Sequence, residues 1–175
     1  MNLPLAYQWL ALESAPRHLL KAMELYGTTE IVGPKNNPVI MGWANEVGLG
    51  TIYKEDVTPW CGLFMAVIMK RAFREPVKDP LYALNWNTFG TKIIQPMLGD
   101  ILTFTRKNGG HVGLYVGEDI AAYHVLGGNQ GDRVSIVRIA KERLSEVRRP
   151  AYTLQPTNVR KIILASNGKL STNEA

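Results

Sequence analysis

Residues 56–64 read DVTPWCGLF, and this stretch predicts the start of a helix that carries Cys61, the only cysteine of the chain. Thr58 suits the N-cap position, and Pro59 suits the first helical turn because its φ is fixed and its missing N–H is not needed there. The apolar run from Leu63 to Phe73 is typical of a buried helix. We therefore expect Cys61 in the first turn, beside N–H groups that have no partner within the helix.

A thiol at the start of a helix is well placed to react. The helix dipole favours negative charge there, and a cationic neighbour can bring the pKa of such a thiol into a range of roughly 3.5 to 7.5. A single cysteine also excludes an intrachain disulfide and metal sites built from several thiolates. Cys61 is therefore a candidate nucleophile, provided that a histidine can reach it.

The composition is that of an ordinary globular domain. The chain has 175 residues, of which 46% are hydrophobic and 20% charged, enough to form one packed core. The net charge of +5 favours polyanionic partners such as nucleic acid, anionic lipid or the bacterial cell wall. Because the basic residues are dispersed, we expect no nucleic-acid partner. Glu13 interrupts the apolar N-terminal stretch and no window has ~18 apolar residues, so we expect neither a secretory signal peptide nor membrane insertion.

The residue pattern changes from helical to extended along the chain. Two short helices are expected in Leu5–Tyr26 and a third in Val39–Val47, separated by a loop rich in Gly, Pro and Asn. Later strands are expected at Ile101–Phe104, His111–Val116, Ala121–Leu126 and Val134–Ile139, with turns at residues 107–110 and 127–132. Helices followed by hairpin-linked strands predict an α+β domain with an antiparallel sheet.

We expect one domain over residues 1–155, of which 1–50 form a helical N-terminal part. Residues 156–175 are expected to be a C-terminal extension that is partly disordered, because its last stretch, 166–175, is polar. No internal repeat or low-complexity tract interrupts the sequence.

Three histidines are candidates for the base that a nucleophilic thiol needs. His18 lies on the amphipathic N-terminal helix and is expected at the surface. His111 opens a strand whose other face is apolar, and Gly113 on its own face leaves room for a large neighbour. His124 lies on the next strand, flanked by apolar residues. Position alone leaves open whether His111 is a base or a structural strand residue.

Four segments occur in an order that resembles a known group of enzymes. They are TPWCG (58–62), PMLGDI (96–101), GHVGLYVG (110–117) and LGGNQ (126–130). Together they resemble the CHAP and NlpC-like superfamily of cysteine peptidoglycan hydrolases, in particular its small, often phage-encoded subgroup with a Pro-Trp-Cys motif. Further similar pieces are Glu30, GP at 33–34, NPVI at 37–40, NW at 85–86 and FG at 89–90. The resemblance covers Leu5 to Pro150.

The resemblance implies a papain-like core, in which the nucleophile helix packs on an antiparallel sheet. It implies Cys61 as the nucleophile and His111 as the base that takes the thiol proton and later protonates the leaving amine. CHAP enzymes often carry an asparagine on the following strand, which makes Asn129 the favoured third residue, since an amide oxygen can fix the imidazole tautomer. NlpC-like enzymes often use a histidine there, which makes His124 the alternative. Strand parity places these two on opposite faces unless the glycines form a bulge.

The resemblance also suggests which residues contact substrate, and it implies neither metal nor cofactor. The candidates are Trp60, Asp56, Trp86, Tyr115 and Gln130. For the tryptophans the simpler interpretation is core packing, and for Asp56 it is a carboxylate that caps a loop. The backbone N–H of Cys61 is expected to supply one donor of an oxyanion hole.

The function that the resemblance implies is cleavage of an amide bond in the peptide of bacterial peptidoglycan, through a thioester. The bond would be that of an endopeptidase or of an N-acetylmuramoyl-L-alanine amidase. Such a protein would be a bacteriophage endolysin dependent on holin for export, or an antibacterial effector with an immunity protein. It would be a monomer made in the cytoplasm that acts at the cell wall or in the periplasm. The alternatives are a non-catalytic wall-binding or virion-associated module on the same fold, and an amidase or acyltransferase with a non-wall substrate.

Overall fold

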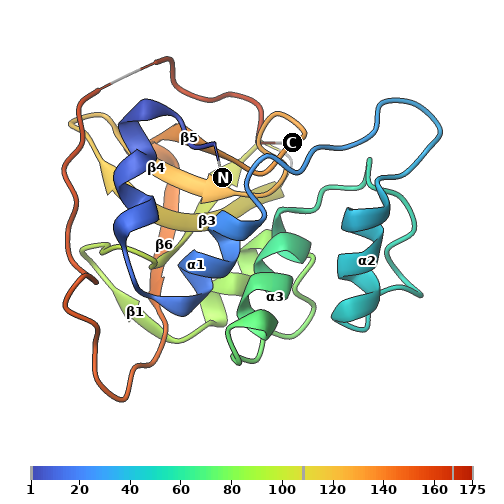
Figure 1. Cartoon of the computed structure of the whole chain (residues 1–175), viewed down its shortest axis with the longest axis horizontal. Helices are drawn as coiled ribbons and strands as arrows, with labels where there is room; N and C mark the ends of the chain where they lie inside the picture. Colours follow the sequence, from blue (N-terminus) through green and yellow to red (C-terminus); the bar gives the residue numbers. More distant parts are fainter. Residues whose placement is uncertain (1, 108, 167, 175) are drawn as a thin grey trace.

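An antiparallel sheet of six strands forms the frame of the molecule (Figure 1). The computed structural model of the chain describes residues 2–107, 109–166 and 168–174. The strands lie in the order β1-β6-β2-β3-β4-β5. Their bounds are β1 Thr91–Ile93, β2 Ile101–Arg106, β3 Gly109–Glu118, β4 Ala122–Gly127, β5 Ser135–Ala140 and β6 Leu144–Arg149. Consecutive strands β2 to β5 are neighbours, whereas β6 returns to lie between β1 and β2.

The helices cover one face of this sheet (Figure 1). Three are α-helices: α1 Arg17–Glu24, α2 Pro38–Glu46 and α3 Cys61–Arg71. Short 3-10 helices lie at η1 Leu5–Leu12, η2 Ala83–Thr88 and η3 Lys141–Arg143. α3 packs between α1, α2 and strand β3, and its residues from Cys61 to Met69 are all buried. This explains why the α3 sequence is apolar on every side rather than amphipathic.

Side chains of β3 alternate between the two faces of the sheet. Val112, Leu114 and Val116 belong to the core shared with the helices, whereas Tyr115 belongs to a second core on the opposite face. The C-terminal segment contributes to the second core, because the Tyr115 hydroxyl donates to the carbonyl oxygen of Ile162 at 3.0 Å. The alternation predicted for residues 111–116 is therefore confirmed, and both faces of the sheet are covered.

The α+β class and the antiparallel sheet are confirmed. Each of the four predicted strands lies within or overlaps one of β2 to β5, and the predicted helix at residues 39–47 corresponds to α2. Strands β1 and β6 were not predicted. Residue 108 of the predicted turn lies outside the described residues. None of the helices in the described ranges is long and apolar enough to cross a lipid bilayer.

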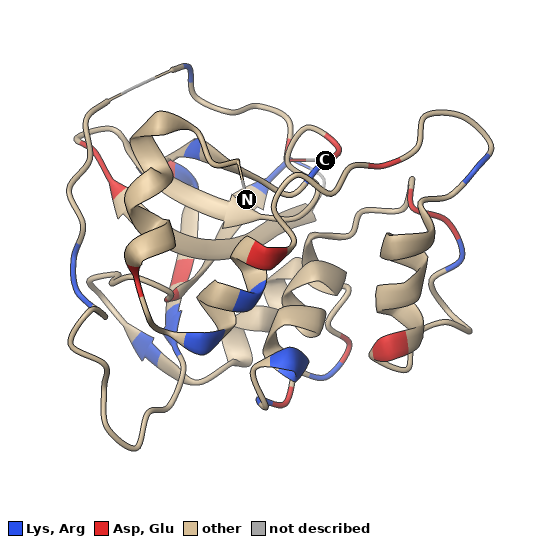
Figure 2. Ribbon diagram, in the orientation of Figure 1, with Lys and Arg blue, Asp and Glu red and all other residues tan. Residues whose placement is uncertain are grey.

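The C-terminal segment runs along the outside of the sheet (red in Figure 1). Ile163 forms an isolated bridge to Glu118, and Leu170 forms one to Arg138 of β5. Residues 170–174, expected within a partly disordered extension, therefore lie against the edge of the sheet. Figure 2 shows Lys and Arg spread over several elements, with two at the carboxyl end of α3, which are Lys70 and Arg71.

Candidate active site

Helix α3 begins at Cys61, so the thiol occupies the first helical position. Trp60 takes the N-cap position, and no side chain caps the helix. The prediction of Thr58 as the N-cap is therefore wrong, because the helix begins further along the chain than expected, and the N–H of Thr58 belongs to a preceding turn with the carbonyl oxygen of Glu55. With no capping side chain, the N–H groups of Cys61 and Gly62 are free to stabilise negative charge on the sulfur.

The thiol is buried against strand β3. Only 2% of the Cys61 surface is exposed, and the backbone N–H of Val112 lies near enough to the thiol to favour its ionised form. Burial raises the pKa of the Cys61 thiol, while the N–H of Val112 and the positive charge of Arg106 oppose this effect. The prediction that the pKa of Cys61 is lowered is therefore wrong, because the loss of solvation on burial outweighs the effect of the helix dipole. The neutral thiol is the resting form.

Close backbone contact holds the first turn of α3 in place. A Cβ atom at Gly62 would clash with the carbonyl oxygens of Pro80 and Leu81, the latter at 2.8 Å. Only glycine lets these carbonyls approach the helix start so closely. The glycine after the cysteine therefore has a packing reason that is independent of chemistry.

His111 lies on β3 directly before Val112, and it is completely buried. Its Nε2 atom lies 2.9 Å from the side-chain oxygen of Gln130. The Gln130 amide nitrogen donates to the carbonyl oxygens of Val125, at 3.1 Å, and Ser135, at 2.6 Å. Because both amide hydrogens of Gln130 are used, its oxygen must be the atom that faces His111. Nε2 of His111 therefore carries the proton and donates it to Gln130.

The other ring nitrogen of His111 is left as a free acceptor. Nδ1 is buried and has no hydrogen-bond partner among the described residues, and no direct hydrogen bond joins it to Cys61 there. Burial lowers the pKa of His111 to about 4, although Gln130 and the charge of Glu174 oppose this effect. At neutral pH the site thus holds a neutral thiol and a neutral imidazole with a lone pair on Nδ1. The N–H of Val112, the residue after His111, favours the ionised form of the thiol.

The glycine pair of the LGGNQ segment makes room for this arrangement. A Cβ atom at Gly127 would lie 2.8 Å from the Gln130 oxygen and 3.2 Å from Nε2 of His111. A Cβ atom at Gly128 would lie 2.6 Å from Cβ of Phe64 in α3 and 2.8 Å from the Trp60 ring. The first glycine therefore admits the His–Gln hydrogen bond, and the second lets this loop pack onto the helix that carries the thiol.

The third residue is the main difference from the sequence-based expectation. Asn129 was favoured as the residue that orients His111, but Gln130 holds that position. Asn129 has a positive φ of 55° and is 1% exposed, and its side-chain oxygen has no hydrogen-bond partner among the described residues. The left-handed turn at Asn129 redirects the chain, so that the next side chain returns over the end of β4. Gln130, expected to contact substrate, is engaged inside the protein.

His124, the alternative third residue, belongs to a different cluster. Its Nδ1 atom lies 2.7 Å from the Tyr7 hydroxyl, and its Nε2 atom lies 2.9 Å from Asp119. Asp119 also accepts from Nε of Arg138 at 2.7 Å. His124 therefore links η1 to the sheet and does not contact His111.

His18 was expected at the surface, and this prediction is wrong. The side chain is fully buried where α1 packs, and its Nε2 atom donates to the carbonyl oxygen of Gly99 at 2.6 Å. Burial lowers its pKa to about 4. The helix has a polar sequence, but its histidine lies on the face that packs against the core.

The remaining proposed substrate residues are buried and make internal hydrogen bonds. The indole N–H of Trp60 donates to Glu30 at 2.6 Å, and that of Trp86 donates to the carbonyl oxygen of Pro80 at 3.0 Å. Tyr115 is fully buried in the second core. These aromatic residues therefore pack the core rather than line a groove.

Asp56 and Gly113 also have structural environments. Asp56 accepts from the backbone N–H groups of Asn37, at 2.7 Å, and Ile31, at 3.3 Å, so it fixes the loop before α2. The space expected beside Gly113 is filled, since a Cβ atom there would lie 2.6 Å from Val125. In this closed form, neither residue offers a surface to a substrate.

Charged residues near His111 were missed by the sequence analysis. After burial, three charges also affect the pKa of His111. The negative charge of Glu174 raises this pKa, and the positive charges of Arg106 and Arg143 lower it. Arg143 binds the Glu174 carboxylate through both terminal nitrogens, at 3.0 and 2.7 Å. Their positions in the sequence, 31 and more residues apart, gave no signal that they meet at the site.

No group of three or more His, Cys, Asp and Glu side chains within the described ranges is placed to hold a metal ion. The chemistry that these residues can perform is proton transfer and attack by sulfur: Nδ1 of His111 can accept a proton, and the N–H groups at the start of α3 can stabilise an anion.

A comparison of the sequence with protein-family models finds no match, and a comparison with curated proteins finds none either.

Proposed function

We propose that the protein is a cysteine hydrolase with a papain-like site, in which Cys61 is the nucleophile, His111 the base and Gln130 the residue that orients the base. The observation that carries the proposal is the state of the His111 ring. Gln130 fixes the proton on Nε2, and Nδ1 has no partner among the described residues, while the N–H of the next residue, Val112, favours the Cys61 thiolate. This is the tautomer that a thiol nucleophile requires of its base.

The proposed reaction begins when Nδ1 of His111 takes the proton of Cys61. The sulfur attacks the carbonyl carbon of an amide, and the N–H group of Cys61 stabilises the oxyanion that forms. Nδ1–H then protonates the leaving nitrogen, the C–N bond breaks, and a thioester remains on Cys61. Water attacks the thioester while His111 accepts one of its protons, and the sulfur leaves with that proton. Gln130 keeps the ring in place throughout, because its oxygen accepts from Nε2–H in every state.

The proposed substrate is an amide in the peptide part of bacterial peptidoglycan. Its support is the ordered resemblance of the segments around Cys61, His111 and Gln130 to the CHAP and NlpC-like enzymes. The net charge of +5 also suits a wall polymer rich in carboxylates and phosphates. An endolysin of a bacteriophage or an antibacterial effector acting in the periplasm would use this activity.

Digestion of purified sacculi, followed by mass analysis of the soluble fragments, tests this function. We expect new amino or lactyl termini with the wild-type protein and none with Cys61→Ala. Fragments cut only at glycosidic bonds, or identical fragments from both proteins, would contradict the proposal.

A non-catalytic wall-binding module is the second candidate, and burial of both Cys61 and His111 favours it. Alkylation by iodoacetamide separates the two functions. A catalytic site should react stoichiometrically at Cys61 and lose this reactivity in His111→Ala. A thiol that remains inert in the folded protein would favour the binding module.

A further inference from the structure

The site is closed in this structure, and residues 170–174 form part of its surroundings. Leu170 pairs in parallel with Arg138 of β5, and the N–H of Ser171 donates to the Arg138 carbonyl oxygen at 2.8 Å. The carbonyl oxygen of Asn173 accepts from the N–H of Gly131 at 3.0 Å. The segment is thus held along the edge of the sheet and then against the loop that carries Gln130.

This path delivers the Glu174 carboxylate into the interior. The residue is 1% exposed, and Arg143 holds both of its oxygens. Although burial opposes the charge, the hydrogen bonds from Arg143 and Ser171 keep the pKa of Glu174 below its ordinary value. Glu174 is therefore a buried, ionised carboxylate. Its negative charge raises the pKa of His111.

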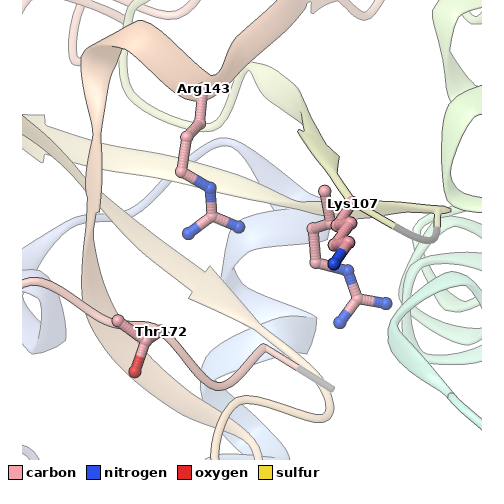
Figure 3. A pocket seen from close by; sticks show the side chains of 4 residues that line it. Lys107, Arg143 and Thr172 are labelled. Carbon is pink, nitrogen blue, oxygen red and sulfur yellow. The ribbon is translucent and has the colours of Figure 1, made fainter.

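The surroundings of Glu174 carry more positive charge than it neutralises. A cavity of about 440 Å³ is lined by Arg106, Lys107, Arg143 and Thr172. Figure 3 shows the side chains of Arg143, Lys107 and Thr172 reaching this cavity from different segments. Nε of Arg106 is buried without a hydrogen-bond partner among the described residues, and its charge lowers the pKa of both Cys61 and His111. A cationic cavity beside the Arg143–Glu174 ion pair thus contains space and an unsatisfied donor.

We propose that this cavity is a carboxylate-binding subsite for an acidic peptide substrate, and that Glu174, held by the Arg143 side chain that lines the cavity, is an internal mimic of that substrate. Arginine pairs with carboxylates through two parallel hydrogen bonds, which is the geometry that Arg143 already forms with Glu174. A substrate carboxylate would displace Glu174, release residues 170–174 and expose the thiol. This inference rests on the proposed hydrolase function, for which it names the class of substrate.

The test compares alkylation of Cys61 by iodoacetate and by iodoacetamide, two reagents of similar size that differ in charge. Because Cys61 is the only cysteine, each rate reports on this site alone. In Glu174→Gln, we expect both rates to rise and the iodoacetate-to-iodoacetamide ratio to increase about fivefold or more, since the competing carboxylate is gone. Arg143→Gln and Arg106→Gln should lower the ratio by a similar factor.

Glu13→Gln is the matched control, because it also removes a carboxylate that pairs with an arginine of the C-terminal segment, Arg160. Its ratio should equal that of the wild type. Arg106→Gln keeps the test valid if Arg143→Gln does not fold, since Arg106 forms no ion pair with another of the described residues. An unchanged ratio in Glu174→Gln and Arg106→Gln would overturn the proposal.

A competition experiment probes the subsite without relying on hydrolysis. The α-amide of N-acetylglutamate, which has one carboxylate, should slow alkylation of Glu174→Gln by iodoacetate, whereas the α-amide of N-acetylglutamine, which has none, should not. Equal effects of the two would overturn the proposal. If the ratio shifts as expected but sacculi are not digested, the subsite stands and the wall-hydrolase function fails. If sacculi are digested and the ratio does not shift, the function stands and the subsite fails.

Discussion

Two buried histidines on neighbouring strands, His111 on β3 and His124 on β4, have opposite environments. Both nitrogens of His124 are satisfied, one by the Tyr7 hydroxyl and the other by Asp119. Among the described residues only Nε2 of His111 has a hydrogen-bond partner, and that partner is the neutral amide of Gln130. A ring with both nitrogens hydrogen-bonded contributes to stability, whereas a ring with an unpaired, deprotonated nitrogen can accept a proton.

The partners of the two rings also differ in charge. Asp119 is an ionised carboxylate shared with Arg138, and the hydrogen bond from Arg138 holds the pKa of Asp119 well below its ordinary value. Gln130 cannot carry charge, so it orients His111 without stabilising the imidazolium strongly. The comparison predicts that changes at His111 affect reaction rate, whereas changes at His124 affect the free energy of unfolding.

The largest expected effect is that of His111→Ala on hydrolysis. We expect the rate of sacculus digestion to fall about 10³-fold or more, because the thiol loses its base. The free energy of unfolding should fall by only ~1 kcal/mol, less than in His124→Ala, since one buried hydrogen bond to a neutral amide is lost while an unsatisfied nitrogen is also removed. Turbidity loss of a sacculus suspension and denaturant unfolding measure the two quantities. A large loss of stability with full activity would reverse the comparison.

His124→Ala should act in the opposite way. It leaves the Tyr7 hydroxyl and one oxygen contact of Asp119 buried without their partner, and we expect a loss of ~3 kcal/mol in the free energy of unfolding. Activity per folded molecule should remain near that of the wild type. Urea unfolding monitored by tryptophan fluorescence measures the loss, with Tyr7→Phe as a milder control expected to cost ~1 kcal/mol.

Gln130→Ala should lower kcat by about 10- to 100-fold, because the tautomer of His111 is no longer fixed. Asn129→Ala tests the residue that the sequence favoured. Its effect on kcat should be small, since Asn129 does not contact His111. Steady-state rates on a soluble wall peptide decide between them. A larger kcat loss in Asn129→Ala than in Gln130→Ala would restore Asn129 as the orienting residue.

Burial of histidines also predicts a pH dependence of stability. The pKa of His111 is lowered to about 4 in the folded state, against about 6.5 in an unfolded chain. Between these values the unfolded state binds more protons, so the stabilising contribution is complete above pH 6.5 and is lost as pH falls toward 4. Each such histidine contributes a slope of up to ~1.4 kcal/mol per pH unit.

His18 shares this behaviour, since its folded pKa is also about 4. Unfolding free energies measured from pH 4 to 8 should therefore show a reduced slope in His111→Gln and again in His18→Gln. An unchanged slope in both variants would mean that neither ring is kept neutral by burial.

Local patterns predicted most of the fold. The alternation after His111, the apolar run after Cys61 and the loop rich in Gly, Pro and Asn before α2 each depend on neighbours in sequence. Strand β6 was missed because its sequence LSEVRR is charged, and its charges are paired only by distant residues, as Arg149 is with Asp100 at 2.7 Å. Long-range pairs of this kind leave no local periodicity.

Only the residues of the candidate site that have a local sequence signal were predicted. Cys61 and His111 stand out through a helix start and a strand face, and the structure places Val112, the residue after His111, near the Cys61 thiol. The choice between Asn129 and Gln130 depended on one left-handed residue, which reverses the parity that a continuous strand would give. Glu174 and Arg143 meet only because the C-terminal segment returns to the sheet, which no local pattern indicates.

Pairing of residues 170–174 with β5 has a second consequence, for assembly. β5 is an edge strand, and the C-terminal segment uses some of its backbone donors and acceptors. When the segment leaves, those groups become available to a strand of any neighbouring molecule. Opening the site would therefore also expose a surface for self-association. The fraction of time that the site is open and the local protein concentration would together determine how long the molecule stays monomeric.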